Sequence, residues 1–220
     1  MNRIIICAVF TALLCILCCS LGMADIQEST IPDISDHQVQ FIENAGQAHE
    51  DILYQVKSAK FSFDFTRNSM LVSGPAEDCK ECNESIIQPV TVTVAGAQDT
   101  TSVEAFDQLP GYANFLFGKN ESDWQKFVPW YGGITYVDIL PGINLTYTGR
   151  DGVLKREFIV QPGTDPGNIR LIYEGSDELS LASDGSLIVS ASFGNLTERA
   201  PYSYQEINGS KVEVASSYLI

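Results

Sequence analysis

The chain has 220 residues, with 13 Lys and Arg against 28 Asp and Glu, so its formal net charge at pH 7 is −15. A charge of this sign repels nucleic acid and anionic lipid, so we exclude DNA and RNA as partners. The length is sufficient for one large domain with a well-buried core, and we favour one continuous unit.

The first 24 residues are predicted to form a secretory signal peptide, 1–24. Arg3 supplies a positive charge, and the run from Ile4 to Leu21 contains no charged residue. This is the pattern of a signal helix, and the small residues of Gly22-Met-Ala24 suit a peptidase site. The mature chain is then expected to begin at Asp25 and to be secreted or held at the cell surface. The alternative is an uncleaved anchor, because about 20 apolar residues span a bilayer; the protein would then contact the membrane only through this segment.

Residues 25–38 are polar and lack periodicity, so we expect a flexible lead-in. From residue 39 to 220 the dominant pattern is alternation of apolar and polar side chains, which is typical of strands with one buried face. The alternating runs are Ile52/Tyr54/Val56, Phe61/Phe63/Phe65, Val90/Val92/Val94, Ile143/Leu145/Tyr147, Leu154/Arg156/Phe158/Val160, Ile169/Leu171/Tyr173, Leu187/Val189 and Val212/Val214.

Turn signals separate these runs at ordinary strand spacing, among them Pro141-Gly142, Asp184-Gly185 and Asn208-Gly209. Such dipeptides supply the backbone angles of tight turns. Helix is expected only in short pieces, at 122–126 or 165–169. We therefore predict an all-β fold, an antiparallel β-sandwich or paired twisted sheets, over residues 39–220. The final run reaches residue 220 without a closing turn, so we expect a chain that is truncated relative to a longer protein.

The mature chain keeps two of the 6 cysteines, Cys79 and Cys82, in a polar stretch. For an exported protein this spacing favours a short disulfide that rigidifies a loop, or free thiols. A metal site would need a second pair of ligands, and a thioredoxin-like redox site would need a helix after a strand. The sequence supplies neither, so we predict no metal ion and no cofactor, with metal and redox chemistry kept as alternatives for this pair.

From Phe41 onward, a series of motifs resembles the N-terminal domain of unknown function that precedes SBBP repeats, which are β-propeller-type, in bacterial and archaeal cell-surface proteins. The resemblance implies a β-rich, exported module without an established activity. The repeats that usually follow are absent from this chain. The motifs that carry the resemblance are Phe41-Ile-Glu-Asn-Ala-Gly-Gln47, Leu109-Pro-Gly-Tyr-Ala-Asn-Phe-Leu-Phe-Gly118, Trp124, Val128-Pro-Trp-Tyr131, Ile134-Thr-Tyr136, Leu140-Pro-Gly-Ile-Asn-Leu-Thr-Tyr147, Lys155-Arg-Glu-Phe158, Gln161-Pro-Gly-Thr-Asp-Pro166, Ile169 to Gly175, Asp184-Gly-Ser-Leu187 and Ala200-Pro-Tyr-Ser-Tyr-Gln205.

The residues do not indicate an enzyme. The 2 histidines, His37 and His49, neighbour no glycine-flanked serine, so a Ser-His triad is not expected. A glycosidase needs two carboxylates across a cleft; Asp64, Asp151, Glu157 and Asp165 are available, but surface solvation explains them equally well. Phosphate-binding glycine motifs are absent. Asp-rich turns could supply oxygen ligands for calcium, but no calcium-loop pattern is present.

Three aromatic residues, Trp124, Trp130 and Tyr131, are a candidate platform for stacking on sugar rings, with core packing as the alternative reading. Asn-X-Ser/Thr sequons mark candidate N-glycosylation sites, which are surface sites in exported proteins. They begin at Asn83, Asn120, Asn144, Asn195 and Asn208. We therefore expect a non-enzymatic cell-surface module with a structural or adhesive role, whose partners are other envelope proteins or glycans. The alternative is a carbohydrate-binding module of the envelope.

Overall fold

The computed structural model describes residues 4–9, 39–58, 60–74, 88–97, 101–150 and 152–220, with residues 4–9 as backbone. Regular structure in these ranges consists of strands and two short 3₁₀ turns, η1 (Glu121–Asp123) and η2 (Pro166–Asn168). All strand pairings in them are antiparallel. The predicted all-β, antiparallel fold is therefore confirmed. No helix in the described ranges has the length and apolar character needed to cross a bilayer.

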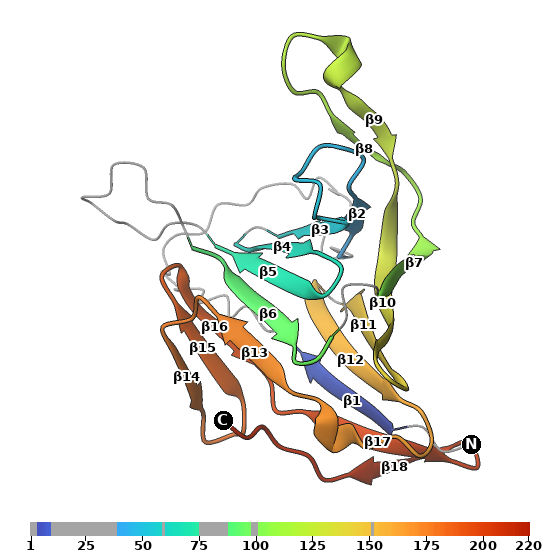
Figure 1. Ribbon diagram of the computed structural model, residues 1–220, viewed down its shortest axis with the longest axis vertical. Helices are drawn as coiled ribbons and strands as arrows, with labels where there is room; N and C mark the ends of the chain where they lie inside the picture. The colour runs from blue at the N-terminus through green and yellow to red at the C-terminus, as the bar shows by residue number, and fades with distance from the viewer. Residues whose placement is uncertain (1–3, 10–38, 59, 75–87, 98–100, 151) are drawn as a thin grey trace, which may run out of the picture.

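The main sheet has 13 described strands and curls on itself (Figure 1). Its order along the sheet is β13 (Leu171–Glu174), β6 (Val90–Val94), β5 (Ser69–Ser73), β4 (Ser62–Phe65), β3 (Tyr54–Lys57), β2 (Phe41–Glu43), β10 (Trp130–Leu140), β11 (Ile143–Arg150), β12 (Val153–Val160), β1 (Ile4–Val9), β17 (Tyr202–Ile207) and β18 (Ser210–Val214), with β7 (Ser102–Gln108) also paired to β10. Two smaller sheets are β14 (Glu178–Leu181), β15 (Leu187–Ala191) and β16 (Gly194–Glu198), and the pair β8 (Ala113–Phe115) and β9 (Gln125–Val128).

Strand β10 is shared by two layers. Tyr131 pairs with Phe41 of β2 and with Gln108 of β7, so these strands lie on opposite edges of β10. Further along β10, Gly133 pairs with β7 on one edge and with β11 on the other. Strands β2 and β11 therefore pair with the same edge of β10, one after the other along its length. One layer then runs from β2 to β13 and the other from β11 to β18. This arrangement is the paired-sheet form of the predicted sandwich.

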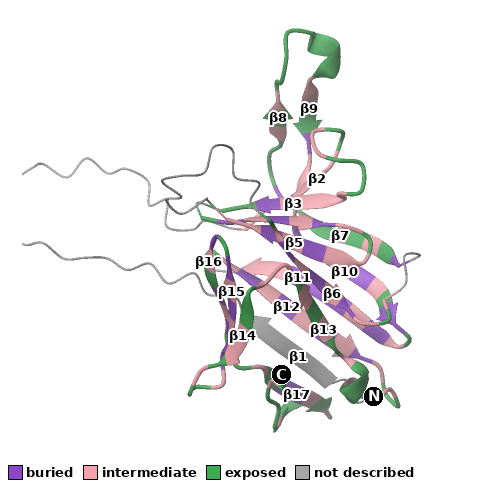
Figure 2. Cartoon of the chain, turned by 60° about the vertical axis from the view of Figure 1, so that its left-hand side comes forward, coloured by how far each residue is buried: buried purple, intermediate pink, exposed green. Residues whose placement is uncertain are grey.

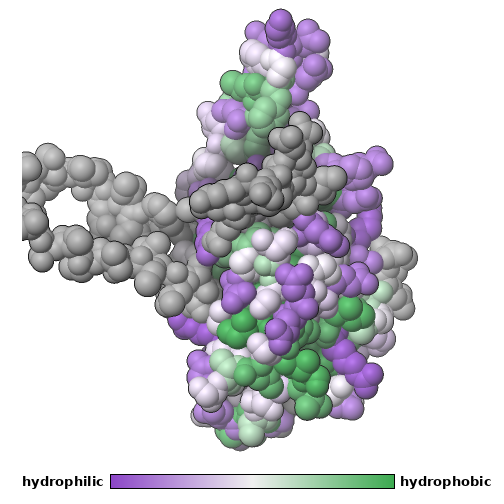
Figure 3. Space-filling model, turned by 90° about the vertical axis from the view of Figure 1, so that its left-hand side faces the viewer, coloured by the Kyte–Doolittle hydropathy of each residue, from purple (hydrophilic) through white to green (hydrophobic). Residues whose placement is uncertain are grey.

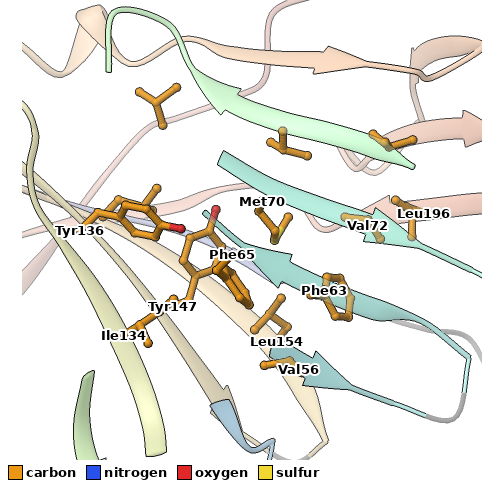
Figure 4. Packing of buried hydrophobic residues seen from close by; sticks show 14 of the residues in the cluster. Val56, Phe63, Phe65, Met70, Val72, Ile134, Tyr136, Tyr147, Leu154 and Leu196 are labelled. Atoms are coloured by element: carbon orange, nitrogen blue, oxygen red, sulfur yellow. The ribbon is translucent and has the colours of Figure 1, made fainter. Parts of the chain in front are cut away.

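The hydrophobic core fills the space between these layers (Figure 4). Phe65 of β4 and Tyr147 of β11 come from opposite layers, and their ring centroids are 5.0 Å apart. The Tyr136 hydroxyl donates a 2.8 Å hydrogen bond across the same gap to the carbonyl oxygen of Thr66. Burial follows the predicted alternation, since every second residue of β6 and β12 is buried. The small sheet β14–β15–β16 closes one side of the core through Phe193, which is fully buried against Phe61.

Two predicted turns have the required backbone angles. Asn208 and Gly209 both have positive φ, 51° and 78°, and connect β17 to β18 as a two-residue hairpin turn. Gly142, at φ 73°, makes the reversal between β10 and β11, as expected for the third position of a type II turn. Of the two 3₁₀ turns, η2 lies within 165–169, where a short helix was expected, and η1 overlaps the other expected segment, 122–126, but begins one residue earlier, at Glu121. Local turn chemistry was therefore readable from the sequence.

Strand β1 was not predicted as a strand. Ile4–Val9, the start of the expected signal helix, is extended and pairs with β12 on one edge and β17 on the other. The other residues of the predicted signal peptide, 1–3 and 10–24, and the predicted lead-in, 25–38, lie outside the described residues. The signal peptide therefore stays a prediction. In the folded chain, its residues 4–9 form a strand of the main sheet.

Candidate interaction surface

An arm, which we define as residues 109–128, projects from one end of the molecule (Figures 1 and 2). It consists of β8, η1 and β9, and its two strands pair only at Ala113 with Val128 and Phe115 with Gln125, with an irregular register between them. Its ends are the buried residues Leu109 and Val128. The arm is thus attached at its base and has little pairing beyond it.

Trp130 fastens the base of the arm to the main sheet. Its indole Nε1 donates a 2.9 Å hydrogen bond to the carbonyl oxygen of Pro110, and the Leu109 amide donates a 3.0 Å bond to the Trp130 carbonyl oxygen. The backbone of Gly111 lies against the ring, because a Cβ there would be 2.9 Å from Trp130 Cζ2. Gly111 also has a φ of +97°, which glycine adopts readily. Trp130 therefore holds the base of the arm in place against the main sheet.

The arm exposes an unusual number of large apolar side chains. The exposed fractions are 50% for Tyr112, 53% for Leu116, 63% for Phe117 and 67% for Phe127. In Figure 3 hydrophobic residues of the arm lie beneath a hydrophilic tip. Clustered exposed apolar residues in a soluble domain mark a surface for a partner or a membrane, since leaving them in water is unfavourable. The arm is the best candidate for an interaction surface among the described residues.

Phe127 is held in a strained conformation. Its φ is 60°, which is rare for a bulky residue, yet its ring is mostly exposed. The Phe127 amide donates a 2.9 Å hydrogen bond to Oδ1 of Asn114, and its ring packs edge-on against Tyr112 with centroids 4.7 Å apart. These contacts stabilise a backbone shape that directs an aromatic ring to the surface. Strain of this kind is commonly kept at functional sites.

The predicted aromatic platform is divided between the arm and the sheet. Trp124 is on the arm, half-buried, with Lys126 Nζ 4.8 Å from the centre of its ring. Trp130 is engaged at the base, as described. The Tyr131 hydroxyl donates a 3.3 Å hydrogen bond to Glu43 Oε2, and its ring meets Tyr54 edge-on. Of the three residues, Trp124 is the one that belongs to the exposed arm.

The segment Phe41-Ile-Glu-Asn-Ala-Gly-Gln47 forms a closed loop beside this surface. The Asn44 amide donates 2.9 Å and 2.7 Å hydrogen bonds to the carbonyl oxygens of His49 and Ile52, and its Oδ1 accepts from two backbone amides of the loop. Gln47 donates to the Glu43 carbonyl oxygen at 2.7 Å. A shallow hollow of about 360 Å³ lies against this loop. Because the Asn44 and Gln47 side chains form hydrogen bonds to the backbone of the loop itself, the motif stabilises the conformation of this loop.

A buried polar network links the main sheet to the small sheet. The Arg156 guanidinium of β12 forms an ion pair with Glu198 of β16, and both side chains are fully buried. Tyr173 donates a 2.6 Å hydrogen bond to Glu198 and accepts a 3.2 Å bond from Arg156. Tyr218, after β18, donates to Glu198 at 3.3 Å. Burial lowers the pKa of Arg156, but Glu198 and the tyrosines outweigh it and raise the pKa well above its usual value, so the guanidinium stays charged.

Buried tyrosines should make the fold sensitive to alkali. Burial raises the pKa of Tyr136 and Tyr173 well above the ordinary value of 10.0, and raises that of Tyr147 against the opposing effect of Arg156. In the unfolded chain these phenols ionise near pH 10, whereas in the folded chain they stay neutral. Their contribution to stability is therefore complete below pH 10 and decreases as the pH rises above 10, by up to about 1.4 kcal/mol per pH unit for each group.

We expect tyrosinate absorbance of these residues to appear together with loss of the far-ultraviolet circular dichroism of the sheets. Monitoring both signals in one alkaline titration tests this. Ionisation of all tyrosines with the β-sheet signal unchanged would contradict the burial argument. The Tyr136→Phe variant is the control: its stability should fall less steeply with pH above 10, because it has one buried phenol fewer, although it also loses the bond to Thr66.

The carboxylates considered for catalysis have local partners. Asp64 accepts from Gln55, Glu157 from Lys155 and Asp165 from the Gly167 amide, and His49 lies 3.3 Å from Asp51 on an exposed loop. His37 and Asp151 lie outside the described residues. Within the described ranges, no three residues of the His, Cys, Asp and Glu types gather as metal ligands.

The sequons fall in different surroundings. Asn120, Asn195 and Asn208 are exposed, while Asn144 is half-buried and its Oδ1 accepts a 2.8 Å hydrogen bond from the Asp138 amide. Cys79, Cys82 and Asn83 lie outside the described residues, so their pairing and glycosylation stay predictions. The side chains of Asn120, Asn195 and Asn208 are therefore accessible for attachment of a glycan.

Two functional features escaped sequence reasoning. Residues 109–118 were assigned only to a motif of the family resemblance, although Tyr112, Leu116 and Phe117 lie outside the alternating runs and could have signalled an exposed apolar segment. The partner of Arg156 was also missed, since Glu198 is 42 residues away. A charged residue within an otherwise apolar alternation was the available signal, because such a residue is buried only with a counter-charge.

A comparison with known protein families gives a match that begins at Phe41, the first residue of the first motif. No curated protein and no solved structure matches this chain. One family model, described as Domain of unknown function (DUF7948), matches residues 41–220, starting at Phe41 and including every strand except β1. The prediction of a domain of unknown function is thereby confirmed, and the chain belongs to the DUF7948 family.

Proposed function

We propose that this chain is an exported, non-enzymatic interaction module of the cell surface that contacts its partner through the arm. The observation that carries the proposal is the group of exposed apolar side chains on residues 112–127, three of them aromatic, on an otherwise acidic domain. Partner surfaces are enriched in such residues at their centres. The predicted signal peptide and the resemblance to N-terminal domains that precede SBBP repeats support a place in the cell envelope.

The arm suits binding better than catalysis. Its exposed residues are apolar, and the charged residues between them, Lys119, Glu121, Asp123 and Lys126, balance in sign. Lys126 has contacts within the arm, 3.9 Å from Glu121 and over the Trp124 ring. A locally neutral, apolar arm can approach a partner without the repulsion that the net charge of the whole chain would cause.

The experiment is a binding assay with purified envelopes of the source organism. We expect labelled protein to bind saturably, and Phe117→Ser with Phe127→Ser to weaken binding about tenfold or more, since each ring contributes on the order of 1.5–3 kcal/mol when buried. Ile172→Ser with Leu181→Ser is the matched control, because these side chains are each 46% exposed and lie off the arm. Equal binding by both double variants would refute a role for the arm.

The second candidate is a carbohydrate-binding module, favoured by Trp124, whose indole lies on the arm and has one cationic neighbour. A glycan array with the intact protein and with Trp124→Ala tests it. Trp124→Ala is preferable to Trp130→Ala, because losing Trp130 would also release the base of the arm. Glycan binding that disappears with Trp124→Ala and survives the Phe117/Phe127 change would favour this second function.

A further inference from the structure

The first apolar residues of the chain occupy a position inside the main sheet. Ile4–Val9 pairs with Val160 to Lys155 of β12 at six consecutive positions. Ile4 to Cys7 also pair with Gln205 to Tyr202 of β17. In Figure 1 β1 lies between β12 and β17 as an internal strand of its layer.

The two neighbours of β1 do not pair with each other. Both run antiparallel to β1, so they are parallel to one another, and a strand spacing of about 4.8 Å places them about 9.6 Å apart. Among the described strands, the β17–β18 hairpin is joined to the rest of the sheet only through β1. An isolated two-stranded hairpin is marginally stable in water. The position of β1 therefore determines whether this hairpin belongs to the sheet.

We call the space between β12 and β17, which β1 occupies, the slot. The residues of β12 determine which side chains it accepts. On β12, Arg156, Phe158 and Val160 are buried at alternate positions, whereas Lys155 and Glu157 on the other face form a half-exposed ion pair. Directly paired residues of neighbouring strands share a face of the sheet. A guest strand therefore needs apolar residues at every second position along β12, and on the other face the position that pairs with the buried Tyr204 of β17 also favours an apolar residue. Ile4–Val9 meets this requirement with its apolar sequence.

These same residues belong to the predicted signal peptide, 1–24. Its removal would leave two rows of unpaired backbone groups facing each other across the width of one strand, which is a ready template for another strand. We propose that the slot between β12 and β17 is a strand-acceptor site. Ile4–Val9 fills it before the signal peptide is removed, and an extended segment of a partner protein, apolar at alternate positions and antiparallel to β12, fills it afterwards. This inference rests on the export proposed above and uses β-strand addition as the binding mode.

The test uses the full-length chain, produced without export and carrying a protease site within residues 25–38. After cleavage, the fragment that contains Ile4–Val9 is expected to stay with the domain during gel filtration. A labelled peptide of residues 3–10, with Cys7→Ser, should then replace it. The same peptide with Ile6→Pro should bind at least about tenfold more weakly, because every amide of a strand paired on both edges points to one neighbour, and proline removes one of these donors.

Hydrogen exchange gives a second measurement that does not depend on peptide affinity. Protection of the amides in β17 and β18 should fall when the fragment is displaced and return with the intact peptide, but not with the Ile6→Pro peptide. Loss of the fragment with unchanged protection of β17 and β18, and no peptide binding, would overturn the proposal. An exported protein that retains residues 4–9 by mass spectrometry would also overturn it.

The outcome can be separated from that of the arm. The Phe117→Ser and Phe127→Ser protein should exchange the peptide at the unchanged rate, because the arm lies at the other end of the molecule (Figure 1). Normal exchange with lost envelope binding would support both proposals independently. Exchange that fails in a protein whose envelope binding is intact would reject the slot alone.

Discussion

Glu198→Gln is expected to lower the free energy of unfolding by about 3–5 kcal/mol, because it removes the counter-charge of a fully buried Arg156. Tyr173 and Tyr218 both direct their hydroxyl groups at this carboxylate, so their hydrogen bonds weaken too. Chemical denaturation monitored by circular dichroism measures the change. The loss should appear as a lower midpoint with an unchanged slope.

Two further variants show whether the ion pair itself is responsible. Arg156→Met and Glu198→Leu combined with Tyr173→Phe should recover most of the lost stability, since this apolar set has no charges to desolvate and leaves no Tyr173 hydroxyl without an acceptor. Glu157→Gln is the matched control on the same strand, because its bond to Lys155 is partly exposed, and such pairs contribute about 0–1 kcal/mol. If Glu198→Gln costs no more than Glu157→Gln, the two buried charges are not coupled as the geometry indicates.

Phe65→Ala is expected to cost about 3–5 kcal/mol, because it leaves a cavity between the two layers of the sandwich. Phe65 is fully buried, and its ring lies 5.5 Å from that of Phe41 and 5.0 Å from that of Tyr147 in the facing layer. The loss should be measured by denaturant unfolding. Phe65→Leu should cost less, since it keeps most of the buried volume.

Phe117→Ala is the control for this second change. Its ring is 63% exposed on the arm, so the free energy of unfolding should change by no more than about 0.5 kcal/mol. A cost of Phe65→Ala below about 1 kcal/mol would mean that the layers do not depend on this contact for their packing. The pair of results separates residues that hold the fold from residues that are available for a partner.

The buried residues and the exposed residues of the arm also differ in the contacts that they make. Arg156, Glu198 and Phe65 are buried and join elements that are distant in sequence. The exposed side chains of the arm, by contrast, make ring contacts mainly with one another, such as Tyr112 with Phe127 and Phe115 with Phe117. Substitutions on the arm should therefore change binding with little effect on folding, which makes the envelope assay interpretable.

The sequence by itself determined the strands and turns whose causes are local. Alternation at residues 61–65, 90–94 and 154–160 predicted β4, β6 and β12, because a strand presents successive side chains to opposite faces. Asn208-Gly209 predicted its hairpin, because these residues tolerate positive φ at little cost.

Tertiary structure alone decided which residues meet. It paired Arg156 with Glu198, fastened the arm through Trp130 and placed Ile4–Val9 between β12 and β17. An apolar run satisfies the requirements of a signal helix and of an internal strand equally well, since both bury apolar side chains. Which structure it takes depends on the partners that the rest of the chain offers, and those partners come together only when the sheet has formed.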